Sequence, residues 1–402
     1  MEGLIIEWLN LAFRWFHVVA AIAWIGASFY FIWLDLSLRE PPQWKADKGV
    51  KGDLWAIHGG GIYEVAKYHL RPQEMPQKLH WFKWEAYSTW LSGSGLLILM
   101  YYLQAQTYLV GHNTWIQSPQ WAVVASICFI LGGQLIYELL LRTPLVKRGL
   151  LIAAALLVVL TLASYLAHQL FSPRAAYLHV GALIATWMAG SVFWGIMPGQ
   201  RKFIAAVSAN QPPDVEAMAF AKLRSTHNNY LTLPVIFCMI SNHYSFLYSH
   251  AYSWLALIAI GVCLAWGRHF FNLKHLGVVK PWILVSSFIG LVVIAAALSL
   301  TSVNQKSTAL SGDASATQSE LFDEAKVAQL IQVHCANCHS ATPTQAGFTA
   351  APAGIIFDSS AQLAAQKVRA LPALKSGYMP LGNFHQLTDI ERKGLIEWLN
   401  AQ

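Results

Sequence analysis

Eight long apolar stretches dominate the chain before residue 302. Each is close to the roughly 20 residues that a membrane-spanning helix needs. In lipid, every backbone polar group must be bonded internally, so such stretches fold as helices. We therefore predict an all-α protein with an eight-helix integral membrane domain over residues 1–301, embedded in a lipid bilayer. The predicted spans are 10–34, 84–104, 119–141, 149–171, 175–197, 229–249, 252–271 and 281–301.

The composition changes after the last predicted span. Residues 302–320 are rich in Ser, Thr, Ala and Gln, which is typical of a flexible linker. The segment 321–402 then contains Cys335-Ala336-Asn337-Cys338-His339, and C-x-x-C-H is the attachment signature of a c-type haem. The two thiols would bond the haem vinyl groups, and the histidine would be the proximal iron ligand. This predicts a small class I-type cytochrome c domain over 321–402, with His339 bound to the metal.

Paired cysteines at this spacing also occur in zinc sites and redox dithiols, which fit the sequence less well. A structural zinc site needs four ligands at characteristic spacing, and the sequence has no second C-x-x-C. A thioredoxin-like dithiol needs a βαβ context, which the apolar pattern does not predict. The remaining cysteines, Cys128, Cys238 and Cys263, fall inside predicted spans and are interpreted as small buried residues.

The sixth iron ligand is predicted to be Met379. It is followed by Pro380 and lies forty residues beyond His339. A thioether ligand raises the potential of a haem iron, which suits an electron acceptor. A methionine packed in the core and ligation by His385 are the alternatives.

A final helix is predicted from Thr388 to Leu399. Thr388-Asp389-Ile390-Glu391 has the form of a capping box, which marks the start of a helix. Ile390, Leu395 and Trp398 are expected on its haem-facing side.

The loop charges orient the predicted spans. Covalent attachment of a c-type haem is completed outside the cytoplasm, so the C-terminal domain must lie outside, and eight spans place the N-terminus there too. Almost all Lys and Arg residues of the loops then fall in the inward loops, which are 35–83, 142–148, 198–228 and 268–280. The short outward loops carry a single basic residue, Arg174. This asymmetry is what the positive-inside rule demands. This predicts a bacterial inner (plasma) membrane protein with a periplasmic cytochrome domain. The net charge of +7 then describes loops, not a nucleic-acid surface.

Three histidines, His17, His179 and His243, fall inside predicted spans at what we expect to be similar depth near the outer surface. Ionisable groups within spans are costly and are candidates for function. Two of them could ligate a b-type haem, or each could be a buried histidine satisfied by a hydrogen bond. Their spacing does not match the paired histidines of a quinol-oxidising cytochrome b, so spacing alone predicts no second haem.

A second ionisable group lies on the predicted inner side. It includes Arg71 in the first loop, His80 and Glu85 at the start of the second span, and Arg224 and His227 before the sixth. Arginines suit a planar, polar anion, and a histidine or glutamate could act as general base. Ordinary loop solvation and the positive-inside rule explain the same charges.

Motifs for other cofactors are absent from the sequence. It has no G-x-G-x-x-G after a strand, no P-loop and no H-E-x-x-H, which argues against a nicotinamide, a nucleoside triphosphate and a zinc protease centre. Gly59-Gly60-Gly61 is interpreted as a flexible loop element without a phosphate-binding context.

Two stretches, from Arg14 to Gly26 and from Arg71 to Ala86, resemble the bacterial membrane-bound urate oxidases, also called urate hydroxylases. The tail motifs 335–339 and 378–383 agree, so the resemblance covers essentially the full chain. The first stretch is also similar to the haem-binding first helix of the membrane protoporphyrinogen oxidases. His17 stands in the place of their histidine, which favours it as a ligand of a b-type haem iron.

The resemblance implies oxidation of urate to 5-hydroxyisourate in purine catabolism, with water supplying the hydroxyl oxygen. Electrons would pass through the cytochrome to a respiratory-chain acceptor, either a soluble cytochrome c or a terminal oxidase. Arg71 or Arg224 would hold the urate anion, and His80, Glu85 or His227 would take a proton. One alternative is a quinol-to-cytochrome c electron-transfer protein with no other organic substrate. A transporter whose cytochrome senses the redox state is a further alternative, which we rank last because no broken-helix repeat pattern is evident.

Overall fold

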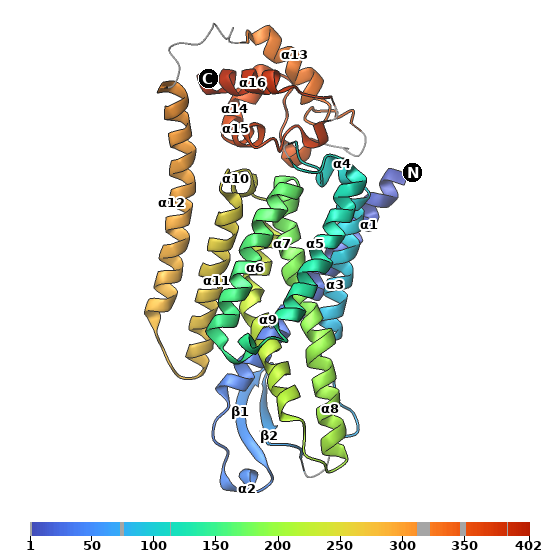
Figure 1. The fold of residues 1–402 in the computed structure, drawn as a ribbon, viewed down its shortest axis with the longest axis vertical. Coiled ribbons are helices and arrows are strands. Elements are labelled where there is room, and N and C mark those ends of the chain that lie inside the picture. Colours follow the sequence, from blue (N-terminus) through green and yellow to red (C-terminus); the bar gives the residue numbers. More distant parts are fainter. Residues whose placement is uncertain (1, 73–75, 113, 312–321, 346–350, 384) are drawn as a thin grey trace.

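The computed structural model describes residues 2–72, 76–112, 114–311, 322–345, 351–383 and 385–402. Long helices form an elongated bundle with a small helical domain at one end (Figure 1). The helices of the bundle are α1 (Glu2–Ser37), α3 (Trp84–Leu97) with the π-helix η1 (Ile98–Tyr102), α5 (Pro119–Leu140), α6 (Gly149–Leu170), α7 (Pro173–Gly190) with the π-helix η3 (Ser191–Ile196) and α8 (Met197–Ser208), α9 (Val215–Ser241), α11 (Ser253–His275) and α12 (Pro281–Ser311).

Six of these helical stretches are long and apolar enough to cross a membrane, which supports a multi-pass membrane protein. They are Trp8–Ser37, Pro119–Leu140, Gly149–Leu170, Pro173–Ser208, Ser253–His275 and Pro281–Leu300. Each coincides with a predicted span. The predicted span 84–104 falls on α3 with η1. The predicted span 229–249 falls on the second half of α9, which ends at Ser241, and on the short helix α10 (Ser245–Tyr248). These helices pack within the same bundle but are not among the six. The count of eight therefore stays a prediction.

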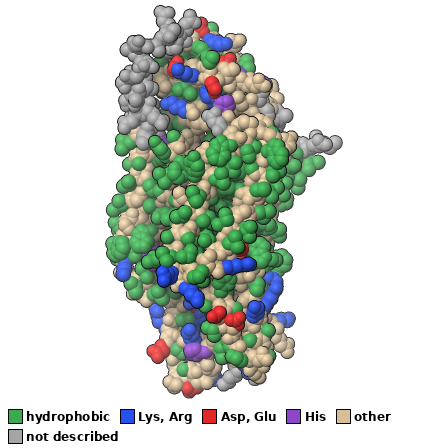
Figure 2. Space-filling model, viewed as in Figure 1, with side chains coloured by type: hydrophobic (Ala, Val, Ile, Leu, Met, Phe, Trp, Pro, Cys, Tyr) green, Lys and Arg blue, Asp and Glu red, His purple; other side chains and the backbone are tan. Residues whose placement is uncertain are grey.

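The face of the bundle seen in Figure 2 is divided by polarity. Hydrophobic side chains cover its middle, and Lys and Arg side chains gather beyond them at the end opposite the small domain. We call this end the distal end. An apolar band bounded by basic side chains is what a bilayer and the positive-inside rule favour.

The distal end carries a β-hairpin, so the all-α prediction is wrong there. Strands β1 (Val50–His58) and β2 (Gly61–Tyr68) pair antiparallel, with His58 opposite Gly61. The turn between them consists of Gly59 and Gly60, whose φ angles are +56° and +80°. Two positive φ angles suit the right-handed twist of a tight hairpin. The glycines form an ordered turn, not the flexible loop element expected from the sequence. The short helix α2 (Gln43–Ala46) lies beside it.

The C-terminal domain is built from helices α13 (Glu324–His334), α14 (Ser360–Ala365), α15 (Lys367–Lys375) and α16 (Asp389–Ala401), with the single turns η4 (Pro352–Gly354) and η5 (Leu381–Asn383). Thr388 and Glu391 form the predicted capping box at the start of α16. Leu395 and Trp398 are buried in the domain core, but Ile390 is 79% exposed. Ile390 precedes Leu395 by five residues, which turns it by roughly 140° around the helix. The expectation that Ile390 faces inward is wrong.

The C-terminal domain rests on the end of the bundle formed by two short helices, α4 (Ala105–Tyr108) and α10 (Ser245–Tyr248) (Figure 1). Here α4 packs on η5, and α10 packs on α15. Helix α12 continues to Ser311, so the first part of the predicted linker 302–320 is helical, and residues 312–320 lie outside the described part of the chain.

Candidate functional site

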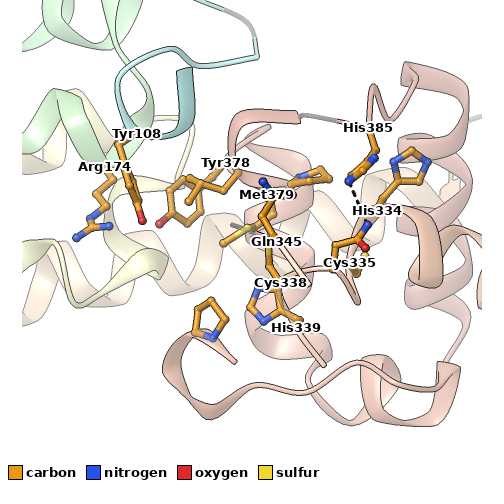
Figure 3. A pocket seen from close by; sticks show the side chains of 14 residues that line it. Tyr108, Arg174, His334, Cys335, Cys338, His339, Gln345, Tyr378, Met379 and His385 are labelled. Carbon is orange, nitrogen blue, oxygen red and sulfur yellow. Dashed lines mark hydrogen bonds between the residues drawn. The ribbon is translucent and has the colours of Figure 1, made fainter. Parts of the chain in front are cut away.

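The C-x-x-C-H residues line a pocket between the two parts of the molecule (Figure 3). Cys335, Cys338 and His339 share it with Met379, and Arg174 of α7 lies on its membrane-domain side. Helix α13 ends just before this motif. The amide of Cys335 still donates to Ile331 O at 2.8 Å, and the amide of His339 donates to Cys335 O at 2.8 Å. These turns bring the two thiols and the imidazole to one pocket.

His339 is held in a defined orientation. Its side chain is buried, and Nδ1 donates to the carbonyl oxygen of Ile355 at 2.9 Å. The ring of Phe357 packs against it with centroids 5.1 Å apart. Burial lowers the pKa of His339, which favours the neutral imidazole. A fixed Nδ1–H leaves Nε2 with the free lone pair, as in histidines that ligate a metal.

Met379 and His385 both line the pocket, but their surroundings differ. Nε2 of His385 accepts a hydrogen bond from the amide of Asn337 at 3.1 Å (Figure 3). That nitrogen is therefore already engaged. The backbone of Met379 is fixed on both sides, because its amide donates to Ala373 O at 3.0 Å and its carbonyl accepts from the guanidinium of Arg392. This arrangement favours Met379 over His385 as the second axial ligand.

The two cysteines are unlike those of a redox dithiol or a thiolate metal site. Burial raises the pKa of Cys335 to about 12 and also raises the pKa of Cys338. Reactive or metal-binding cysteines have lowered pKa values, since the thiolate is the active form. Among the described residues, no three His, Cys, Asp or Glu side chains form a metal-binding group. The pocket therefore fits two thioethers better than two thiolates, and the covalent haem stays a prediction.

The three histidines of the predicted spans do not share one depth. His17 contacts Ser92 of α3, whereas the ring of His179 packs against Tyr101 of η1 with centroids 6.0 Å apart. Nine residues of helix separate Ser92 from Tyr101, which is roughly 13 Å. His243 is exposed and lies two residues beyond the end of α9 at Ser241. The expectation of similar depth is therefore wrong for His17 and His179, because they contact levels of the second predicted span that lie more than two helical turns apart.

Of these histidines, His17 has the geometry of a ligand and His179 that of a core residue. Both ring nitrogens of His179 are bonded, Nδ1 to Ala175 O and Nε2 to Ser126 Oγ, each at 2.7 Å. His17 uses Nδ1 alone, which lies 3.0 Å from the carbonyl oxygen of Thr89 and 3.0 Å from Ser92 Oγ. Gly93 admits the imidazole, since a Cβ at that position would lie 3.0 Å from it. A b-type haem at His17 remains a prediction.

The predicted catalytic residues occupy three separate places. Arg224 is buried and forms a bidentate ion pair with Glu138 of α5, with Nη1 2.8 Å from Oε1. Arg71 is exposed at the distal end and donates to Asn210. Nε2 of His80 lies 3.9 Å from Oε1 of Glu85, whose Oε2 is buried without a partner. The structure does not bring Arg71 and Arg224 together.

His227 belongs to a buried network around Tyr137 of α5. The Tyr137 hydroxyl lies 3.1 Å from His227 Nδ1 and 3.1 Å from Ser191 Oγ, and its ring stacks on Trp187 at 4.9 Å. Ser191 opens the π-helix η3, where the widened turn interrupts α7. Such π-helical insertions are frequent at functional sites.

A family model described as urate oxidase N-terminal matches residues 3–299. The chain belongs to this family. The match covers the bundle as far as α12 and does not extend to the C-terminal domain. No curated protein and no solved structure matches the chain. Membership of the urate oxidase family indicates a urate-oxidase-related oxidoreductase in a membrane.

For this member of the urate oxidase family, reasoning from sequence missed several buried polar residues. The partly buried Glu138 was missed too, although an acidic residue inside the predicted span 119–141 is itself a sequence signal. Arg268 is buried near the end of α11, where the sequence assigned it to an inward loop. Tyr137 and Ser191 carried no such signal, since hydroxyl groups are common in membrane helices.

Proposed function

We propose that this protein is a membrane-bound urate oxidase (urate hydroxylase) that converts urate to 5-hydroxyisourate in purine catabolism. Its electrons would pass through the C-terminal c-type haem to a respiratory-chain acceptor. One observation carries the link between the two parts. The C-x-x-C-H motif and Met379 line a pocket to which the membrane domain contributes Tyr108 and Arg174.

The reaction defines what the protein must provide. Urate and one water give 5-hydroxyisourate, two protons and two electrons. A covalently bound c-type haem would supply a one-electron acceptor of high potential when it has a methionine ligand. The chain must therefore bind the anion, accept protons and hand on electrons singly. A second centre at His17, between the distal end and the C-terminal domain, is part of this proposal.

We propose that either Glu85 or His227 accepts the proton. One carboxylate oxygen of Glu85 is buried without a partner, and His227 Nδ1 shares a hydrogen bond with Tyr137. Glu85 lies in the first turn of α3, and His227 lies near the middle of α9. The basic residues at the distal end favour that end as the cytoplasmic side. In this orientation the C-terminal domain lies in the periplasm of a bacterial inner membrane.

The test is anaerobic reduction of the purified full-length protein. Adding urate should produce the reduced c-type absorbance spectrum together with 5-hydroxyisourate. A His339→Ala variant should bind urate but fail to transfer electrons to an external acceptor. Reduction by a quinol and not by urate contradicts the proposal and favours the quinol-to-cytochrome c alternative.

A further inference from the structure

Among the residues that the structure describes, Arg268 is a buried cation without a counter-ion. Its side chain lies on α11 between α1 and α9 and is 6% exposed. None of the ion pairs formed by the described residues includes it. Arg224, buried to a similar degree, is neutralised by Glu138. Removing a charge from water is costly unless a partner compensates it, and the cost is greatest inside a membrane protein.

Arg268 contacts one polar side chain and one aromatic ring. Its Nε donates to Oδ1 of Asn229 at 2.7 Å, and the guanidinium lies over the ring of Phe29, with Cζ 3.9 Å from the ring centroid. Its Nη2 is buried and makes no hydrogen bond. Asn272 follows Arg268 by one helical turn on α11, and its Oδ1 is also buried without a partner. One face of α11 thus holds an unused donor and an unused acceptor a single turn apart.

Urate has the complementary chemistry. It is a planar anion with carbonyl oxygens that accept hydrogen bonds and ring N–H groups that donate them. A guanidinium presents its N–H groups in one plane, which suits such an anion, and the ring of Phe29 covers one face of this guanidinium. Arg268 lies in the last third of α11, toward the distal end, where an anion made in the cytoplasm would enter.

We propose that Arg268, with Phe29 and Asn272, binds the urate anion. This rests on the proposed function and deepens it by assigning the substrate anchor to α11 in place of Arg71 or Arg224. His227 stands two residues before Asn229 on α9, which is roughly 200° around the helix, so His227 faces Tyr137 of α5 while Asn229 faces Arg268 of α11.

The experiment measures binding of radiolabelled urate to the full-length, fully reduced protein under anaerobic conditions, where turnover cannot proceed. Arg268→Met should raise the Kd for urate about thirtyfold or more, because a buried hydrogen-bonded charge is lost. Arg268→Lys should give an intermediate Kd, since it keeps the charge but loses the planar fork. Exposed Arg201 on α8 provides the matched control, and Arg201→Met should bind as the wild type does. Uncharged hypoxanthine should compete poorly.

The unfolding temperature separates a binding role from a structural one. Without urate, Arg268→Met should unfold no earlier than the wild type, because it removes an unpaired buried charge. Saturating urate should raise the unfolding temperature of the wild type and not that of this variant. An unchanged Kd in Arg268→Met overturns the inference, as does a loss of binding matched by earlier unfolding.

Should Arg268→Met fail to fold, Asn272→Ala and Phe29→Leu replace it, and unchanged urate binding in both also overturns the inference. A wild-type protein that neither binds urate nor is reduced by it overturns the proposed function itself. A wild type that binds and oxidises urate while these variants bind it equally well overturns only the assignment to Arg268.

Discussion

The ring of Tyr378 packs edge-to-face on the ring of Tyr248, with centroids 5.2 Å apart. Tyr378 immediately precedes Met379, and Tyr248 ends helix α10 of the membrane domain. An aromatic pair of this kind contributes about 0.5–1.5 kcal/mol beyond its buried area. The residue next to the predicted iron ligand therefore helps to hold the C-terminal domain on the bundle.

Replacing Tyr248 with Ala should slow electron transfer between the two domains severalfold without lowering haem content. The weaker contact leaves the C-terminal domain docked for a smaller fraction of the time. Rapid-mixing absorbance measurements of urate-dependent reduction test this. Tyr63→Ala, an exposed tyrosine on β2 at the distal end, is the control and should reduce at the wild-type rate. Equal rates in both variants contradict the docking role of Tyr248.

The His112–Asp389 ion pair crosses the same boundary, with Nε2 and Oδ1 3.0 Å apart, but the Asp389 side chain is 86% exposed. Exposed pairs contribute little to stability. The hydrogen bond from His112 and its electrostatic interaction with the carboxylate lower the pKa of Asp389. The contribution of this carboxylate is therefore complete above its ordinary pKa of about 3.9 and is lost as the pH falls through the lowered value. Asp389→Asn should slow reduction less than Tyr248→Ala at pH 7, and a larger effect contradicts this ranking.

Haem attachment is open to a direct test by mass. Cys338→Ser should lose one thioether, and Cys335→Ser with Cys338→Ser should lose the covalent adduct entirely in denaturing mass spectrometry. Cys263→Ser in α11 is the matched control and should keep the full adduct mass. A wild-type chain of unmodified mass rules out covalent haem and removes the electron route proposed above.

The sequence predicted the apolar helices and the capping box well, because both depend on local pattern. Thr388 and Glu391 carry their own signal, as does the long apolar run of α6. Contacts between residues far apart in the chain could not be predicted from local pattern. Nothing local to Arg224 announces Glu138, which lies 86 residues earlier, and nothing local to His179 announces Ser126.

The hairpin at the distal end was missed for a related reason. Two adjacent glycines are compatible with a flexible loop as well as with a tight turn. The ordered turn follows from cross-strand pairing over the whole length of β1 and β2. The sequence could not reveal that pairing, since the strands lie within a segment that the apolar pattern assigns to a loop.

Met379 is predicted to set the potential of the bound haem. Replacing it with His should keep a six-coordinate iron and lower the midpoint potential by about 0.1 V or more, since an imidazole stabilises the oxidised iron relative to a thioether. A redox titration followed by absorbance measures this. His385→Gln is the control and should leave the potential near that of the wild type. A fall with His385→Gln and none with Met379→His would assign the axial position to His385.

Variants of the Arg224–Glu138 pair test whether Arg224 is structural or takes part in the reaction. Glu138→Ala leaves a buried guanidinium without a counter-ion, and we expect a loss of about 3–5 kcal/mol in stability. Replacing both partners, as in Glu138→Leu with Arg224→Met, should recover most of that loss because no isolated charge remains. Thermal unfolding in the same detergent compares the single and double variants. If Arg224 only holds α9 against α5, the double variant should oxidise urate at near the wild-type rate. Loss of turnover in a stable double variant would instead place Arg224 in the reaction, as the sequence pattern predicted.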